Sequence, residues 1–173
     1  MRHRRIQLVA AVAVLAIASV VATTAVAGGG GDDVEARLTG LEEVPVISTE
    51  GSGKFKAEIR SDRIDYKLSY RDLEGGSVLF AHIHLGQRTA NGGVAAFLCG
   101  GGGKDPCPPS PATVRGTILP ADVVGPTGQG IPAGGFDELV DRIEDGVTYA
   151  NVHTTQFTSG EVRGQIDGDG DDD

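Results

Sequence analysis

Basic clusters and catalytic motifs are both scarce in this sequence. The formal net charge is -9 at pH 7, and beyond the first few residues no Lys/Arg cluster is present to neutralise phosphates, which argues against a nucleic-acid partner. The chain has no G-x-S-x-G elbow, no Gly-rich phosphate loop followed by Lys-Ser/Thr, and no H-E-x-x-H pair. These absences leave no recognisable catalytic constellation and favour a protein that is not an enzyme.

A long apolar run occurs only near the N-terminus, where it extends from Leu8 to Val21 after three arginines and ends before Ala25-Val26-Ala27. A basic segment, an apolar segment and a small-x-small site are typical of a secretory signal peptide, here residues 1–27. The alternative is a retained anchor, but the run is shorter than the roughly 20 residues that span a bilayer. We therefore expect a secreted or cell-envelope protein with no transmembrane segment after cleavage, and no lipid anchor, because the site lacks a cysteine.

The rest of the chain has the length of one domain. Consecutive glycines and aspartates predict a flexible leader at residues 28–33, and the ordered domain is expected at residues 34–166. Residues 167–173 superficially resemble a calcium loop, but the chain ends before a ligand at the twelfth position, so a solvated acidic tail is the better interpretation.

Period-two alternation of apolar and polar residues runs through the domain and predicts strands with one face in a core. Phe136, Leu139, Val140 and Ile143 instead recur at helical spacing and predict a short amphipathic helix over 136–144. We therefore predict an all-β, antiparallel, immunoglobulin-like or superoxide-dismutase-like β-sandwich with one short helix. The expected strands are 34–39, 54–60, 64–70, 78–85, 94–99, 114–119, 147–154 and 161–166.

Only two cysteines are present, Cys99 and Cys107, on either side of a Gly- and Pro-containing segment. In an exported protein such a pair predicts a disulfide that closes a small loop. Metal binding by the two thiols is the alternative, but the segment offers no further Cys or His to complete a tetrahedral site.

Three histidines follow the predicted signal peptide, and their placement is the most informative feature of the domain. His82 and His84 share one face of a strand, opposite the apolar set that should face the core, and His153 has the corresponding position on a later strand. Two imidazoles on one strand face can bind one metal, and a third would complete a site for copper or zinc. The alternative is that the histidines form ordinary hydrogen bonds on a polar sheet surface.

Convergence of the histidines requires the two strands to be neighbours in one sheet. If they are, Asn151, Glu161 and Arg163 are candidates to support the ligands, because they belong to the same polar face as His153 or to the strand that follows it. Arg163 could equally form a plain structural ion pair.

Several short motifs occur in a fixed order along the chain. In order and spacing they resemble the motifs of the CHRD (chordin) domain family, over residues 34–166. Val46 stands where the family often has a second proline, and Thr158-Ser159-Gly160 stands where it often has Pro-Gly-Gly. The motifs are L-T-G-L-E-E-V-P at 38–45, A-H-I-H-L-G at 81–86, N-G-G-V at 91–94, Y-A-N-V-H-T at 149–154 and G-E-V-R-G-Q-I at 160–166.

The resemblance implies an immunoglobulin-like β-sandwich of a secreted bacterial protein, whose partner would be an unknown extracellular or envelope protein. In animal chordin the domain is part of an extracellular growth-factor antagonist whose contacts belong to other modules, so that activity is not transferred. The H-x-H strand and third histidine are also similar to the copper ligands of copper/zinc superoxide dismutases, without their bridging histidine and zinc ligands. Three function classes follow, in order of preference: an interaction or structural module, a copper- or zinc-binding domain, and a superoxide-dismutase-like redox enzyme.

Overall fold

The computed structural model describes residues 32–168, and this part of the chain folds into eight strands and one α-helix. The predicted signal peptide, most of the predicted leader and most of the acidic tail lie outside the described residues. The strands are β1 (Asp32–Thr39), β2 (Ser52–Arg60), β3 (Arg63–Arg71), β4 (Val78–Leu85), β5 (Gly93–Cys99), β6 (Ala112–Ile118), β7 (Thr148–Thr154) and β8 (Val162–Gly168); the helix is α1 (Phe136–Glu144).

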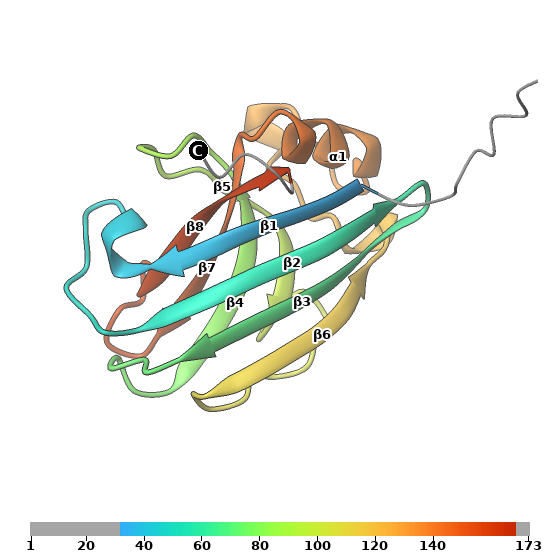
Figure 1. Ribbon diagram of the computed structural model, residues 1–173. Coiled ribbons are helices and arrows are strands. Elements are labelled where there is room, and N and C mark those ends of the chain that lie inside the picture. The colour runs from blue at the N-terminus through green and yellow to red at the C-terminus, as the bar shows by residue number, and fades with distance from the viewer. Residues whose placement is uncertain (1–31, 169–173) are drawn as a thin grey trace, which may run out of the picture.

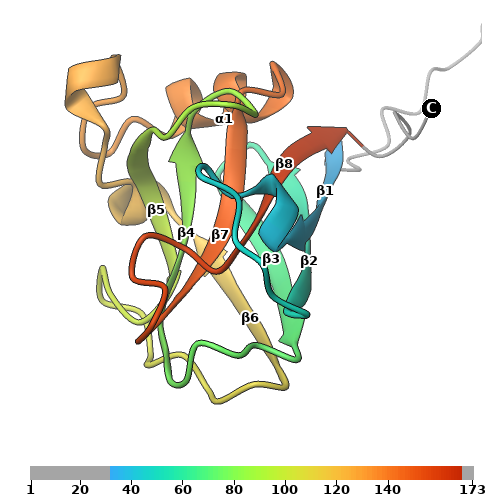
Figure 2. The same cartoon turned by 90° about the vertical axis from the view of Figure 1, so that its left-hand side faces the viewer.

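All eight strands belong to one antiparallel sheet with the order β5-β4-β7-β8-β1-β2-β3-β6. The sheet folds over on itself, so that β1, β2, β3 and β6 form one layer and β4, β5 and β7 lie behind it (Figure 1). The view from the side shows the two layers facing each other (Figure 2). The predicted all-β antiparallel fold with one short helix is confirmed.

Alternation along each strand explains how the core is filled. In the β2–β3 hairpin Phe55 pairs with Leu68 and Ala57 with Tyr66, and all four side chains are buried. The intervening charged residues point outward, as the period of two requires. The hydroxyl of Tyr66 also donates to the carbonyl of Leu98 at 2.7 Å, which connects β3 in one layer to β5 in the other.

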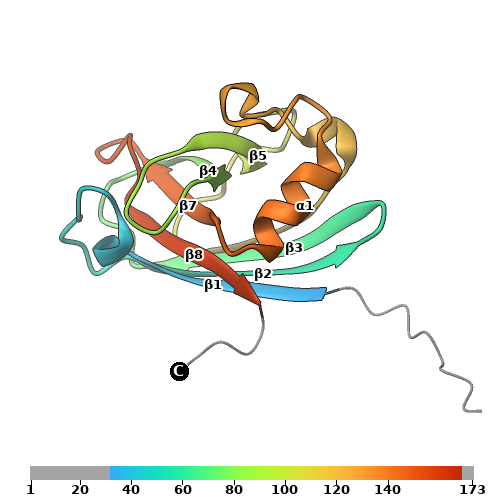
Figure 3. The same ribbon diagram turned by 90° about the horizontal axis from the view of Figure 1, so that it is seen from above.

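Helix α1 has the predicted bounds and lies where the two layers separate (Figure 3). Its buried residues Phe136, Leu139 and Ile143 join the core, while Asp137 and Glu138 occupy the first turn, where the helix dipole favours negative charge. None of the helices within residues 32–168 is long and apolar enough to cross a membrane.

Most strand ends differ from the expected ones by one or two residues, and at two of them the sheet extends beyond the expected domain. β1 begins at Asp32, because Asp32 and Asp33 pair with Ile59 and Glu58 of β2, so the end of the predicted leader is part of the sheet. β8 extends to Gly168, which pairs with Val34, and thus includes the first two residues of the predicted tail. In both cases backbone pairing with a longer neighbouring strand outweighs a composition typical of flexible segments.

Candidate metal centre

The three histidines converge because β4 and β7 are antiparallel neighbours. His82 pairs with Asn151 and His84 with Tyr149 across the two strands, and His153 lies two residues beyond Asn151. Paired residues and their alternate neighbours point to the same face of a sheet. All five side chains therefore lie together on the face of β4 and β7 that is opposite the apolar core.

This face is not a polar surface in contact with water, as the alternation alone suggested. His82, His84 and His153 are only 6%, 8% and 7% exposed. Loops cover them: the loop after β4 contributes the carbonyl of Gly92, and the loop after β7 contributes the carbonyl of Thr158. The histidines thus form a second buried layer, which is polar and lies outside the sheet.

Two backbone carbonyls determine where the hydrogens lie on two of the rings. Nδ1 of His84 lies 3.0 Å from the oxygen of Gly92, and Nδ1 of His153 lies 2.9 Å from the oxygen of Thr158. A carbonyl only accepts, so each Nδ1 carries a hydrogen and each Nε2 of the neutral ring carries a lone pair. Histidines that bind metals usually donate their other ring N–H in this way.

The spacing of the ring nitrogens fits one metal ion. Nδ1 of His82 lies 3.1 Å from Nε2 of His153, and one ligand atom from each of the three histidines lies within 4.8 Å of the others. In a tetrahedral site with metal–nitrogen bonds of 2.0–2.1 Å, neighbouring nitrogens are about 3.3 Å apart. The 3.1 Å separation of the His82 and His153 nitrogens is close to that value.

Burial keeps the three imidazoles neutral. It lowers the pKa of His82 to about 3 and that of His84 to about 4, and nearby imidazoles add repulsion between positive charges. Burial also lowers the pKa of His153. At neutral pH each ring therefore carries one hydrogen and one lone pair, as a metal ligand must.

A carboxyl group lies close to the cluster that the sequence analysis did not single out. Glu43 follows the short 3-10 helix η1 (Gly40–Glu42) and is 5% exposed. Burial raises its pKa to about 7, and the charge of Arg163 and a hydrogen bond from Asn151 partly oppose this shift. Glu43 lies within the L-T-G-L-E-E-V-P motif, but no periodicity in the sequence connects it to the histidines.

Arg163 supports the site through an aromatic ring. The guanidinium lies 3.4 Å from the centre of the Tyr149 ring, and that ring stacks on His84 at 4.8 Å with the planes nearly parallel. Arg163 also donates to the carbonyls of Gln87 and Ala90 in the loop after β4. It therefore holds in place the loop that supplies the Gly92 carbonyl, and it reaches the histidines through the Tyr149 ring.

Glu161 is placed away from the histidines. Its carboxylate accepts hydrogen bonds from the hydroxyls of Thr49 and Thr154 and from the backbone N–H groups of Glu74 and Gly75. The side chain is fully buried. Of the three supporting residues suggested by the sequence, Asn151 contacts a histidine, Arg163 acts through Tyr149, and Glu161 joins loops at another place.

The disulfide between Cys99 and Cys107 is present, with the two Cα atoms 5.0 Å apart. The loop that it closes includes Gly101 and Gly102, at which a Cβ atom would lie 2.4 and 2.6 Å from atoms of the Phe97 ring. Phe97 in turn packs edge-on against His82, with the ring centres 4.5 Å apart. The disulfide-closed loop therefore backs one side of the histidine cluster.

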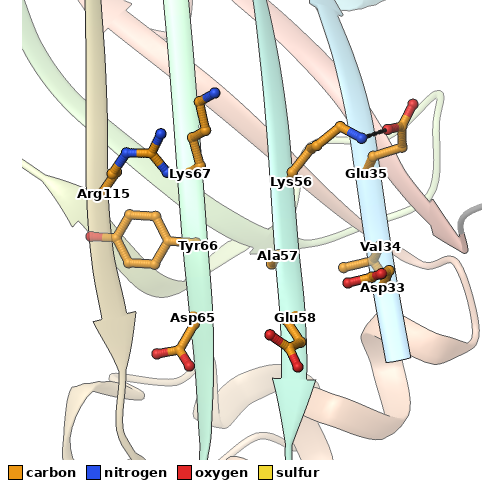
Figure 4. Close-up of a pocket in the computed structure, with 10 residues that line it drawn as sticks. All are labelled: Asp33, Val34, Glu35, Lys56, Ala57, Glu58, Asp65, Tyr66, Lys67 and Arg115. Atoms are coloured by element: carbon orange, nitrogen blue, oxygen red, sulfur yellow. Dashed lines mark ion pairs between the residues drawn. The ribbon is translucent and has the colours of Figure 1, made fainter. Parts of the chain in front are cut away.

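A separate polar pocket of about 310 Å³ lies on the layer formed by β1, β2, β3 and β6 (Figure 4). Lys56, Lys67 and Arg115 are cross-strand neighbours there, and Lys56 forms an ion pair of 2.9 Å with Glu35. Glu58 also lines the pocket, so its wall carries both positive and negative charges. None of the three histidines lines this pocket, and we assign it no ligand.

A family model described as the CHRD domain matches residues 34–166, which is more than half of the chain. This chain belongs to the CHRD domain family. Neither the curated proteins nor the solved structures include a match to it. The matched CHRD segment contains the three histidines as well as Glu43 and Asn151, so the whole candidate site lies within the family's domain.

Proposed function

We propose that this CHRD domain binds one copper or zinc ion through His82, His84 and His153. The observation that carries the proposal is Nε2 of His84, a buried lone pair with no hydrogen-bond partner among the described residues. Leaving a buried acceptor without a partner costs about 1–3 kcal/mol, and native proteins rarely do so. A metal ion held also by His82 and His153 would supply the missing partner.

A purely structural cluster of hydrogen-bonded histidines explains less. It accounts for Nδ1 of His82 and Nε2 of His153, which lie 3.1 Å apart. It leaves Nε2 of His84 without a partner, although the site fixes that ring firmly by stacking and by the Gly92 carbonyl. The donor set also agrees with the ions proposed, because imidazole suits copper and zinc.

Titration of metal-stripped protein with Zn(II) or Cu(II) in a calorimeter tests the proposal. We expect one site, its loss in the His82→Ala, His84→Ala double variant and its weakening in His153→Ala. Glu58→Ala is the control. Its carboxylate lines the pocket on the layer formed by β1, β2, β3 and β6, so its removal should not affect the metal affinity. Unchanged affinity in the folded histidine variants, as judged by circular dichroism, would contradict the proposal.

We also propose that the domain acts outside the cytoplasm as an interaction module for a secreted or envelope protein. The family, the Cys99–Cys107 disulfide and the signal-like N-terminus support this location. Protein recovered from the extracytoplasmic fraction should begin at Gly28. Recovery of only the uncleaved chain from the cytoplasm would contradict the location, and cross-linking on intact cells without any joined protein would contradict the interaction.

A further inference from the structure

We infer that Asn151 is a fourth protein ligand of this ion, binding through Oδ1, so that the site has three nitrogens and one oxygen and is closed. The inference rests on the proposed metal site. It assigns to Asn151 a direct bond to the ion, whereas its place beside His153 in the sequence suggested only a supporting role. One contact of Asn151 supports it, because neither of the two atoms in contact carries a hydrogen.

That contact joins Oδ1 of Asn151 to Nε2 of His153 at 2.9 Å. The amide oxygen has no hydrogen to donate. Nε2 of His153 has none either in the neutral ring that binds a metal, because the single N–H hydrogen is on Nδ1, where the Thr158 carbonyl accepts it. Two lone pairs therefore face each other at hydrogen-bond distance, an arrangement that a cation between them would turn from repulsive to favourable.

Exchanging the positions of Oδ1 and Nδ2 of Asn151 would remove this repulsion but would create another. The Asn151 Nδ2 atom lies on the side of Glu43: a Cβ atom at Gly160 would be 2.8 Å from Nδ2 and 2.4 Å from Oε1 of Glu43. In this orientation the amide nitrogen lies beside Oε1 of Glu43, a buried acceptor with no hydrogen-bond partner among the described residues. With Glu43 ionised, reversal would place the amide oxygen next to a carboxylate. Glu43 thus acts as a positioning residue that aims Oδ1 at the histidines.

The same residue also lies next to the second strand of the site. Asn151 pairs with His82 of β4, and His84 lies on the same face two residues farther along that strand. Asn151 therefore lies on the same face as His84 and His153, whose Nδ1 hydrogens leave a lone pair on each Nε2. The distances of 2.9 and 3.1 Å around Nε2 of His153 are close to the edge of about 3.3 Å in a tetrahedron of ligands.

A closed set of four protein ligands has consequences for what the ion does. Zinc sites with four protein ligands are structural, whereas catalytic zinc keeps one position open for water or substrate. A tetrahedral arrangement also suits Zn(II) better than Cu(II), which prefers tetragonal geometry. The ion would cross-link β4 to β7 beneath the covering loops, with no position for a reacting molecule.

A crystal structure of the Zn(II)-loaded protein, with zinc competition titrations of two variants, tests the inference. We expect a zinc–Oδ1 distance of about 2.0–2.2 Å, a loss of affinity of roughly 10- to 100-fold or more in Asn151→Ala, and retained affinity in Asn151→Asp, which keeps an oxygen at that position. Gln165→Ala is the matched control, because Gln165 is an equally buried amide on the same face that binds the carbonyls of Gly86 and Gly146.

Substitution by Co(II) adds a readout that a merely structural role of Asn151 would not change. The wild type should give the intense visible absorption of a four-coordinate ion that does not respond to azide, and Asn151→Ala should gain an azide-sensitive position. Three imidazoles with a water molecule as the fourth ligand in the zinc structure would overturn this inference and leave the proposed function intact. Absence of zinc from the wild-type protein would overturn both.

Discussion

Lowering the pH of the metal-stripped protein from 6.5 to 5 should reduce its free energy of unfolding, because the native state resists protonation of buried imidazoles. The pKa of His82 falls from 6.5 to about 3 on folding, and that of His84 from 6.5 to about 4. As the pH falls below 6.5 the unfolded chain therefore binds protons that the native state does not. The stability contributed by these groups is present above pH 6.5 and is lost as the pH falls through the native pKa values.

The magnitude follows from 1.36 kcal/mol per pKa unit. The shifts correspond to about 5 kcal/mol for His82 and about 3 kcal/mol for His84, spread over the whole window down to about pH 3. Near pH 5.5 both are almost fully protonated in the unfolded chain and neutral in the native state, which gives a slope of about 2.5 kcal/mol per pH unit. The lowered pKa of His153 acts in the same direction.

Glu43 opposes this slope in part of the window. Its pKa rises from 4.5 to about 7 on folding, so the native state holds a proton that the unfolded chain releases. The stability contributed by Glu43 is present below pH 4.5 and is lost as the pH rises through about 7. Near pH 5.5 this removes about 1.2 kcal/mol per pH unit, which halves the slope expected from His82 and His84. Glu43→Gln should therefore about double the slope.

Urea unfolding of metal-stripped wild type and Glu43→Gln at several pH values between 5 and 6.5, followed by circular dichroism, measures both slopes. Equal slopes for the two proteins would refute the role given to Glu43. A wild-type stability that does not change over this interval would refute the neutral, buried state of the histidines.

Two further predictions concern stability away from the histidines. Reduction of the Cys99–Cys107 disulfide, whose cysteines are eight positions apart, should lower the free energy of unfolding by about 2 to 3 kcal/mol, because a short loop is closed; unchanged urea unfolding in the presence of reductant would contradict this. Glu161→Ala should cost about 3 to 5 kcal/mol, since it leaves the buried donors of Thr154 and Gly75 unpaired. The half-buried surface control Glu58→Ala, which removes one ion pair with Arg60, should change the stability by no more than about 1 kcal/mol, and a similar small effect in Glu161→Ala would refute the assigned network.

Local periodicity was enough to predict the elements of this fold. Each strand has a buried apolar face, and the spacing of Phe136, Leu139 and Ile143 predicts α1 with the bounds observed. The placement of His82 and His84 on one strand face followed from the same period of two. These features depend on residues within a few positions of each other, so the sequence contains them directly.

The completed site depends on contacts that no local pattern encodes. The pairing of β4 with β7 depends on the topology of the whole sheet. From the sequence, the histidines could be predicted to converge only on the condition that these strands are neighbours. The burial of the histidine face depends on loops whose backbone carbonyls, at Gly92 and Thr158, carry no residue-type signal. Glu43 reaches the cluster from the opposite end of the chain, and only its position in a family motif drew attention to that segment.

On the proposed function, the pairing of β4 with β7 brings together ligands from positions 71 residues apart. No site for the ion exists until the last quarter of the chain is available and the sheet has been assembled around it. A chain that crosses a membrane unfolded would therefore leave the compartment of its synthesis without a bound metal ion. The metals available where folding ends, rather than those available at the ribosome, would then decide which ion this protein carries.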